Sequence, residues 1–370
     1  MLRNVQAIRA IAALLVVFEH LSFELERSDP GARTLFSPFY HLGNFGVDLF
    51  FVISGFIMVA TNWDAFGKAN ASRVFLMRRF IRIYPPYWLV LVPIIAIMLI
   101  SPREFMHAHQ GNTNVLASIL LAPQSTAPLL GPSWTLTFEL LFYFVFAAVL
   151  MARRKLLVPI LLGWLTLQLI FSVIWRAEAD PYLALLKQPL PIEFILGAFI
   201  GVLYKERRIR AVVLVGLFGL CSVLVLWFAC LAPEPIVDFD SANIMRVVFF
   251  GIPAACIVYA AVGLEALGRR TAPKQMVTLG DASYSLYLWH LPVIAFLRVV
   301  LARFHVHGIV ADSIVQTLTL IFTVGLSLFL YRRFERPVTS YLNMKILGKS
   351  VDVGGESTDA KKKRMTLPSP

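Results

Sequence analysis

The chain has 370 residues, of which 58% are hydrophobic and only 15% are charged, and its formal net charge is +12. This composition is too apolar for an ordinary soluble domain and favours a membrane protein. The positive charge does not indicate nucleic acid, because most of the 34 Lys and Arg residues cluster in short loops between apolar segments.

Apolar segments of roughly the length of a transmembrane helix recur along the whole chain. Runs such as 212–231 are continuously apolar and lack the alternation of a membrane β-barrel, so we predict an all-α polytopic membrane protein. An even number of spans puts both termini on one side, and the distribution of Lys and Arg predicts that this side is the cytoplasm. The ten predicted spans are 6–23, 41–61, 84–101, 133–152, 157–175, 189–204, 212–231, 243–263, 279–301 and 309–331.

Residues 1–340 are predicted to form the transmembrane domain. In this topology 102–132 lies outside, and its apolar stretch 115–121 is too short to cross the bilayer. Residues 341–370 include the basic run Lys361–Arg364 among small and polar residues, so we expect a basic, disordered cytoplasmic tail.

An ionisable side chain inside an apolar span is costly and therefore suggests a function. In the first span ten residues separate Arg9 from His20, which places them about 16 Å apart along a helix. They share a helix face but cannot touch. Because Glu24 and Glu26 follow, His20 also fits an ordinary histidine at the membrane boundary.

Two carboxylates lie in apolar surroundings, Asp48 within GVDLFFVISGF and Glu139 within SWTLTFELLFY. The predicted topology puts both of them, together with His20, in the outer half of the membrane, where they could converge. An imidazole oriented by a carboxylate is what a general base for a hydroxyl nucleophile requires. The alternative is a buried charge network that only fixes helix packing.

Basic residues gather at the cytoplasmic end of the third predicted span, in the sequence RRFIRIYPPY. Arg79 and Arg82 are three residues apart, so they share a helix face and could bind a phosphate together, with Arg9 near the same side. Ordinary anchoring by positive residues is the alternative. Arginines inside and a histidine with carboxylates farther out fit a long anionic donor such as coenzyme A.

The remaining polar residues of the spans carry weaker signals. His290, among aromatic residues, fits a packed histidine as well as a site, and Glu193 and Glu335 fit ion pairing or helix ends. No metal is expected, because the histidines of the predicted outer loops have no carboxylate or cysteine to complete a site: His107, His109, His305 and His307.

Together these motifs resemble the membrane acyltransferase family 3, which acylates sugars of bacterial surface polysaccharides and some antibiotics. The resemblance runs over about residues 4–337 in the family's motif order. The family often has two successive acids where this chain has Glu139-Leu140, and we do not expect the fused extracytoplasmic hydrolase-like domain that many members carry. The motifs are Arg9 with His20, residues 46–56, residues 78–85, Ser133-Trp134 with Glu139, and Ser283-Tyr284-Ser285 with Trp289-His290.

The resemblance implies transfer of an acetyl group from acetyl-CoA to a hydroxyl of a cell-surface or exported polysaccharide, such as exopolysaccharide or lipopolysaccharide, in the bacterial inner membrane. The implied partners are acyl-CoA, a saccharide acceptor in free or lipid-linked form, the lipid bilayer and other polysaccharide-biosynthesis proteins, but no nucleic acid. The implied roles are His20 as catalytic base, Asp48 and Glu139 in the active centre, and Arg9, Arg79 and Arg82 as ligands of acyl-CoA.

Two alternatives remain at this point. The donor could carry another acyl group, such as succinyl, which the visible residues do not exclude. The chain could also be a transporter or flippase of a sugar-lipid, in which the same intramembrane charges line a path for an anionic substrate.

Overall fold

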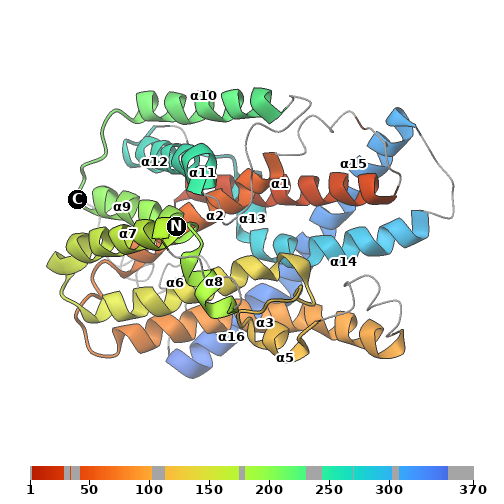
Figure 1. The fold of residues 1–370 in the computed structure, drawn as a ribbon, viewed down its shortest axis with the longest axis horizontal. Helices are drawn as coiled ribbons and strands as arrows, with labels where there is room; N and C mark the ends of the chain where they lie inside the picture. The colour runs from red at the N-terminus through yellow and green to blue at the C-terminus, as the bar shows by residue number, and fades with distance from the viewer. Residues whose placement is uncertain are drawn as a thin grey trace, which may run out of the picture.

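The computed structural model describes residues 2–28, 34, 42–101, 113–174, 180–230, 244–269, 271–301 and 308–348, and its regular structure is helical throughout. The predicted all-α class is confirmed (Figure 1). The helices are α1 (Arg3–Ser28), α2 (Leu42–Asn62), α3 (Ala71–Ile100), α5 (Val115–Leu120), η2 (Gly131–Ser133), α6 (Trp134–Met151), η3 (Arg154–Leu156), α7 (Leu157–Ile174), α8 (Pro181–Lys187), α9 (Pro191–Lys205), α10 (Val212–Cys230), α11 (Ile244–Arg246), η4 (Val247–Gly251), α12 (Ile252–Ala266), α13 (Lys274–Asp281), α14 (Ser283–Leu301), α15 (Ile309–Leu330), η6 (Tyr331–Glu335) and α16 (Arg336–Leu347).

Six helical stretches of the described residues are long and apolar enough to cross a membrane, which supports a multi-pass membrane protein. A seventh forms if α8 and α9, which meet at 47°, are one broken span. Each of the ten predicted segments overlaps a helix, but the number ten and the N-in, C-in orientation remain predictions. The six stretches are Leu42–Asn62, Ala71–Ile100, Gly131–Met151, Arg154–Ser172, Ile244–Ala266 and Ile309–Leu347.

Two predicted segments are shorter than the helices that contain them. The third predicted span begins at residue 84, and α3, which contains it, begins at Ala71 and includes the basic run as well as Pro85 and Pro86. Arg79 and Arg82 therefore lie on one helix, as their spacing predicted. The tenth segment continues through η6 and α16 to Leu347, past the predicted domain end at 340, and most of the predicted tail lies outside the described residues.

Helix α15 shows a pattern opposite to that of a helix in a soluble protein. Its exposed side chains include Leu318, Ile321 and Phe322. Its buried positions are all polar: Asp312, Ser313, Gln316, Thr319, Thr323 and Ser327. Hydroxyls of this row donate to the carbonyl four residues earlier, as Thr323 does to Thr319 at 2.7 Å. An apolar outer face and an inner face whose polar groups bond within the bundle are what lipid exposure favours.

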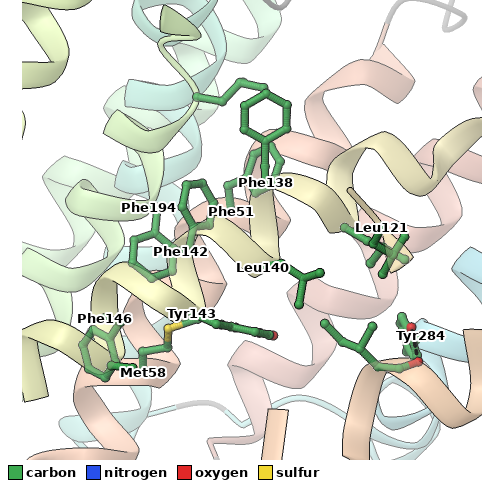
Figure 2. Packing of buried hydrophobic residues seen from close by; sticks show 14 of the residues in the cluster. Phe51, Met58, Leu121, Phe138, Leu140, Phe142, Tyr143, Phe146, Phe194 and Tyr284 are labelled. Carbon is green, nitrogen blue, oxygen red and sulfur yellow. Dashed lines mark hydrogen bonds between the residues drawn. The ribbon is translucent and has the colours of Figure 1, made fainter. Parts of the chain in front are cut away.

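The core is an aromatic cluster between α2, α3, α6 and α9 (Figure 2). Phe142 of α6 stacks on Phe194 of α9 with ring centroids 4.3 Å apart. Helices α2 and α9 approach so closely that a Cβ on Gly55 would lie 2.0 Å from the Phe194 carbonyl oxygen, and one on Gly197 would lie 1.9 Å from that of Val52. Glycine at both positions permits this crossing.

Helix α1 is the element that brings candidate residues from different helices together. It packs against α2, α12, α13, α14 and α15. Its contact with α13 is close, because a Cβ on Gly280 would lie 1.9 Å from the carbonyl oxygen of Gln6. The rotation of α1 is thus fixed near its first turns, which determines where Arg9 and His20 point.

Candidate active site

A pocket with an empty volume of ≈ 780 Å³ lies between α1, α2, α3, α6 and α14, and we call it the arginine pocket. Its lining includes Arg9 from α1, Arg79 and Arg82 from α3, and Glu139 from α6. The three arginines predicted from the sequence as one group therefore share a cavity. Three guanidinium groups against one carboxylate favour an anionic ligand.

Arg9 is held in place by neutral groups. Its side chain is 6% exposed, and its two terminal nitrogens donate to the Gln6 side-chain oxygen at 3.1 Å and to the Ser283 hydroxyl at 2.9 Å. Gln6 in turn donates to Asp281 at the end of α13. Both hydrogen bonds that orient the guanidinium are accepted by neutral groups, and the nearby carboxylates Glu335, Asp281 and Glu139 act on it electrostatically, so it can still bind an anion in the pocket.

Arg79 and Glu139 are linked by one aromatic residue. The Arg79 guanidinium carbon lies 5.3 Å from the centroid of the Phe75 ring and 5.4 Å from that of Tyr143. The Tyr143 hydroxyl donates to Oε1 of Glu139, which also accepts from Ser54 at 3.5 Å. Stacking and hydrogen bonding restrict both charged groups to one orientation.

His20 contacts a second histidine, His290 of α14, with ring centroids 4.9 Å apart and planes at 71°. In each ring Nδ1 lies near a backbone carbonyl oxygen, that of Val16 at 2.8 Å for His20 and that of Tyr287 at 2.6 Å for His290. Carbonyls only accept, so Nδ1 carries the hydrogen and the neutral ring has its lone pair on Nε2. The fully buried Nε2 of His290 has no hydrogen-bond partner in the described part of the chain. We call these residues the histidine pair.

The histidine pair is joined to the arginine pocket through Tyr287 rather than by lining it. Tyr287 lines the pocket, and its ring centroid is 5.8 Å from that of His290. Its hydroxyl donates to the Pro132 carbonyl at 2.6 Å, and the ring packs at 6.2 Å against Phe50, which also lines the pocket. The histidine pair and the arginine cavity are therefore neighbours separated by aromatic side chains.

Asp48 belongs to a different group of charges. Its carboxylate accepts two hydrogen bonds from Arg246 of α11, at 3.1 and 3.0 Å, and both side chains are buried. Glu193 of α9 and Glu19 of α1 are close enough to interact electrostatically with this pair. We call these four residues the acidic cluster. Successive helix positions point about 100° apart, so α2 directs Phe50 and Ser54 toward the pocket and Asp48 toward α11.

The structure thus separates three residues that were expected to converge: His20 in the histidine pair, Glu139 in the arginine pocket and Asp48 in the acidic cluster.

Sequence reasoning missed Arg246 as the partner of Asp48, although an arginine within the predicted span 243–263 was a visible signal. It also left His290 undecided. Glu335, expected in ion pairing or at a helix end, accepts from Ser285 at 2.5 Å.

The family model described as an acyltransferase domain, acyltransferase 3, matches residues 2–332. The chain belongs to this acyltransferase family. Among curated relatives, the exopolysaccharide production protein ExoZ of Rhizobium meliloti is 33% identical over 68% of this chain and 76% of its own length. The acyltransferase MdmB of Streptomyces mycarofaciens is 26% identical over 80% of this chain and 79% of its own.

The peptidoglycan O-acetyltransferase OatA of Listeria monocytogenes is 22% identical, and here the match covers 80% of this chain but only 50% of that protein. No solved structure matches the chain. The family match makes the chain an acyltransferase, an enzyme that uses an acyl donor, and its apolar helices support a multi-pass membrane protein. In the described residues no group of three or more metal-ligating side chains is present.

Proposed function

We propose that the chain is an O-acetyltransferase of the bacterial inner membrane that moves an acetyl group from acetyl-CoA to a hydroxyl of an exported or cell-surface saccharide. The observation that carries this proposal is the arginine pocket, in which Arg9, Arg79 and Arg82 come from two helices and face one carboxylate. The phosphates of coenzyme A are the kind of anion that guanidinium groups bind with paired hydrogen bonds.

The donor is proposed to bind with its phosphates at the three arginines and its pantetheine arm directed toward the histidine pair. Arg9 and His20 belong to one helix and lie about 16 Å apart along its axis, which suits an extended pantetheine arm. The rings of Phe50 and Tyr287 stand at the pocket wall next to the histidines. In this proposal these apolar surfaces guide the thioester and exclude water from it.

His20 is proposed as the catalytic base. Its Nε2 takes the proton of the acceptor hydroxyl as the oxygen attacks the thioester carbonyl; the new C–O bond forms, the C–S bond breaks, and the proton passes to the leaving CoA sulfur. Glu139 is the carboxylate proposed to act within the pocket. Asp48 is proposed to act in the active centre indirectly, by holding α2 and α1 through the acidic cluster.

The nature of the acceptor is supported by the names of relatives. One is a protein of exopolysaccharide production, and two others are named as a putative peptidoglycan O-acetyltransferase, YrhL, and a peptidoglycan O-acetyltransferase, OatA. All three names refer to a saccharide polymer, and two of them to O-acetylation, which supports a saccharide hydroxyl as the acceptor. The N-in, C-in topology with ten spans is part of the proposal, and it places His20 in the outer half of the membrane.

The test is incubation of purified protein in detergent with labelled acetyl-CoA and polysaccharide extract from the native host. Wild type is expected to release CoA and to label the extract, and His20→Ala is expected to lose at least about 1,000-fold in rate, since a catalytic base of this kind is a major part of catalysis. Protein-bound label without acceptor would identify an acyl-histidine intermediate.

His20→Ala with wild-type rates would remove His20 from the mechanism. Absence of CoA release from wild type, combined with movement of a sugar-lipid across vesicles, would favour a transporter instead. Replacing acetyl-CoA by succinyl-CoA in the same assay identifies the acyl group, because only the productive donor gives acceptor-dependent CoA release.

A further inference from the structure

A second groove lies on the opposite face of α6 from the arginine pocket, between the segment that precedes η2 and helix α8. Trp134, Thr137 and Phe138 line this groove, whereas Thr135, Leu136 and Glu139 line the pocket. Only the first turns of α6 separate the two spaces. We call this second space the amide groove; its empty volume is ≈ 840 Å³.

Among the described residues, the lining of the amide groove contains hydroxyls, amides and aromatic or apolar surface, but no charged side chain. Its residues are Ala122, Pro123, Gln124, Ser125, Thr126, Pro128, Trp134, Thr137, Phe138, Pro181, Ala184, Leu185 and Gln188. The arginine pocket, in contrast, carries four charged residues. A neutral polar groove does not suit the phosphates of the donor, and its composition does suit a neutral ligand rich in hydroxyl groups.

Three side chains of the groove walls have unused hydrogen-bonding capacity. The side-chain oxygens of Gln124, Thr126 and Gln188 are buried and have no hydrogen-bond partner among the residues that the structure describes. A buried acceptor without a donor costs free energy unless a ligand or water supplies the donor. Gln124 and Thr126 come from the segment before η2 and Gln188 follows α8, so side chains with an unpaired oxygen lie on both sides of the groove.

Both walls are fixed to the helix bundle by buried polar residues. Ser118, 1% exposed, accepts from the side-chain nitrogen of Gln124 at 3.3 Å and from the backbone N–H of Leu129 at 3.1 Å. On the other wall the side-chain nitrogen of Gln168 donates to the carbonyls of Leu186 at 2.9 Å and Gln188 at 2.5 Å. The groove is therefore preorganised, as a binding site must be to select a ligand.

Trp134 supplies the remaining element of such a site. Its indole is partly exposed at the groove and packs edge-on against Phe138, with ring centroids 5.8 Å apart. The aromatic face offers a flat apolar surface, and the apolar C–H face of a sugar ring is a ligand that combines such a surface with hydroxyls. Helix α6 begins at Trp134, which the predicted topology places on the outer side of the membrane.

We propose that the amide groove binds the neutral sugar of the acceptor, with one sugar ring on Trp134 and its hydroxyls at Gln124, Thr126 and Gln188, beside the arginine pocket. This inference rests on the proposed acyl transfer to a saccharide. It assigns donor and acceptor to the two faces of one helix. The group that the groove recognises is a neutral sugar with free hydroxyls, in a free acceptor and in a lipid-linked one alike.

The test uses the full chain in its native host, with the chromosomal copy deleted and replaced by variants. The double variant Gln124→Met with Gln188→Met keeps side-chain length but removes both amides, and we expect saccharide O-acylation to fall about tenfold or more, since each lost hydrogen bond costs about 1 kcal/mol. Trp134→Ala is expected to cause a similar loss, and Trp134→Phe to restore most of it. Alkali-released acyl groups are measured separately in the polymer and in the organic-extractable lipid-linked fraction, because loss in the latter identifies a lipid-linked acceptor.

Binding of CoA to the purified variants, measured by calorimetry, provides the control for folding and for the donor site. It is expected to equal that of wild type. Leu183→Ala serves as a matched variant, because Leu183 is exposed on the same helix α8 but does not line the groove, and it should keep its O-acylation. Wild-type O-acylation in the Gln double variant and in Trp134→Ala overturns the groove assignment. If deletion of the gene leaves O-acylation unchanged, the proposed function itself fails, and the two failures are thereby distinguished.

Discussion

The arginine pocket and the acidic cluster have opposite charge balance although both lie within the same helix bundle. The pocket has three guanidinium groups and one carboxylate around an open volume, whereas the cluster has three carboxyl groups around the single guanidinium of Arg246 and is packed closed. In the pocket, Arg9 is held by neutral partners. In the cluster, Asp48 and Arg246 are paired directly.

This difference distinguishes a binding site from a structural brace, by which we mean a cluster of ion pairs that holds helices together. Charged groups that border a cavity without a directly paired counter-ion can bind a ligand, whereas charged groups that pair in a buried contact fix the helices relative to one another. The acidic cluster joins α1, α2, α9 and α11 through Glu19, Asp48, Glu193 and Arg246. Since Glu19 precedes His20, the brace also sets the rotation of α1 at the histidine pair.

The largest effect on stability is expected from Arg246→Leu. The substitution leaves Asp48, Glu193 and Glu19 without their cation in a buried site, and breaking a buried ion pair from one side costs about 3–5 kcal/mol. Thermal unfolding in detergent should show a markedly lower midpoint. Adding Asp48→Leu to the same chain should recover part of the loss, because the pair is then removed together.

The matched control for this prediction is Arg208→Leu. Arg208 pairs with Glu206 at 3.2 Å, but its side chain is 72% exposed, so the pair contributes little. Equal midpoints for the Arg246 and Arg208 variants would show that the acidic cluster is not a brace.

A smaller effect, on binding rather than on stability, is expected from Arg79→Met. Methionine retains apolar contact with Phe75 and Tyr143 but loses the charge, and a charge-assisted contact contributes about 1.5–3 kcal/mol, so KM for acetyl-CoA should rise roughly 10- to 100-fold. The unfolding midpoint should stay close to that of wild type. The measurement pairs donor-dependent kinetics with thermal unfolding of the same preparation.

Arg154→Met serves as the comparison for Arg79→Met. Arg154 also lies over an aromatic ring, that of Trp63 at 5.1 Å, but it is outside the arginine pocket. An unchanged KM is expected for it. If Arg79→Met lowers stability and leaves KM unchanged, the arginine pocket is a second brace rather than the donor site.

The charged residues of the arginine pocket and the acidic cluster differ in whether the sequence alone could group them. Arg79 and Arg82 are neighbours on one helix face, and Arg9 and His20 share another, so helical periodicity alone groups them. Asp48 meets Arg246 across 198 positions of sequence, and whether it faces α11 or the pocket depends on the rotation of α2. That rotation is set by the glycine crossing with α9, a tertiary contact that periodicity does not encode.

The helices, like the site residues, could be predicted from the sequence only in part. Apolar runs located a helix at every predicted span, because a continuous apolar segment in lipid has to be helical. The full length of α3 was not predicted, because only 84–101 is continuously apolar, whereas the helix also contains the basic run, whose Arg79 and Arg82 line a cavity inside the bundle.

The smallest effect is expected from Ser283→Ala, which tests whether Arg9 serves the pocket or the packing. The Ser283 hydroxyl accepts from Arg9 at 2.9 Å, and its loss removes one of the two hydrogen bonds that hold this guanidinium within the described part of the chain. KM for acetyl-CoA should therefore rise about fivefold, equivalent to about 1 kcal/mol, with kcat unchanged. Ser285→Ala, two residues along α14, is the control, because Ser285 donates to Glu335 instead. It should lower the unfolding midpoint and leave KM unaltered. If the two serine variants behave alike, Arg9 belongs to the packing of α1 against α14, and the donor site is reduced to the two arginines of α3.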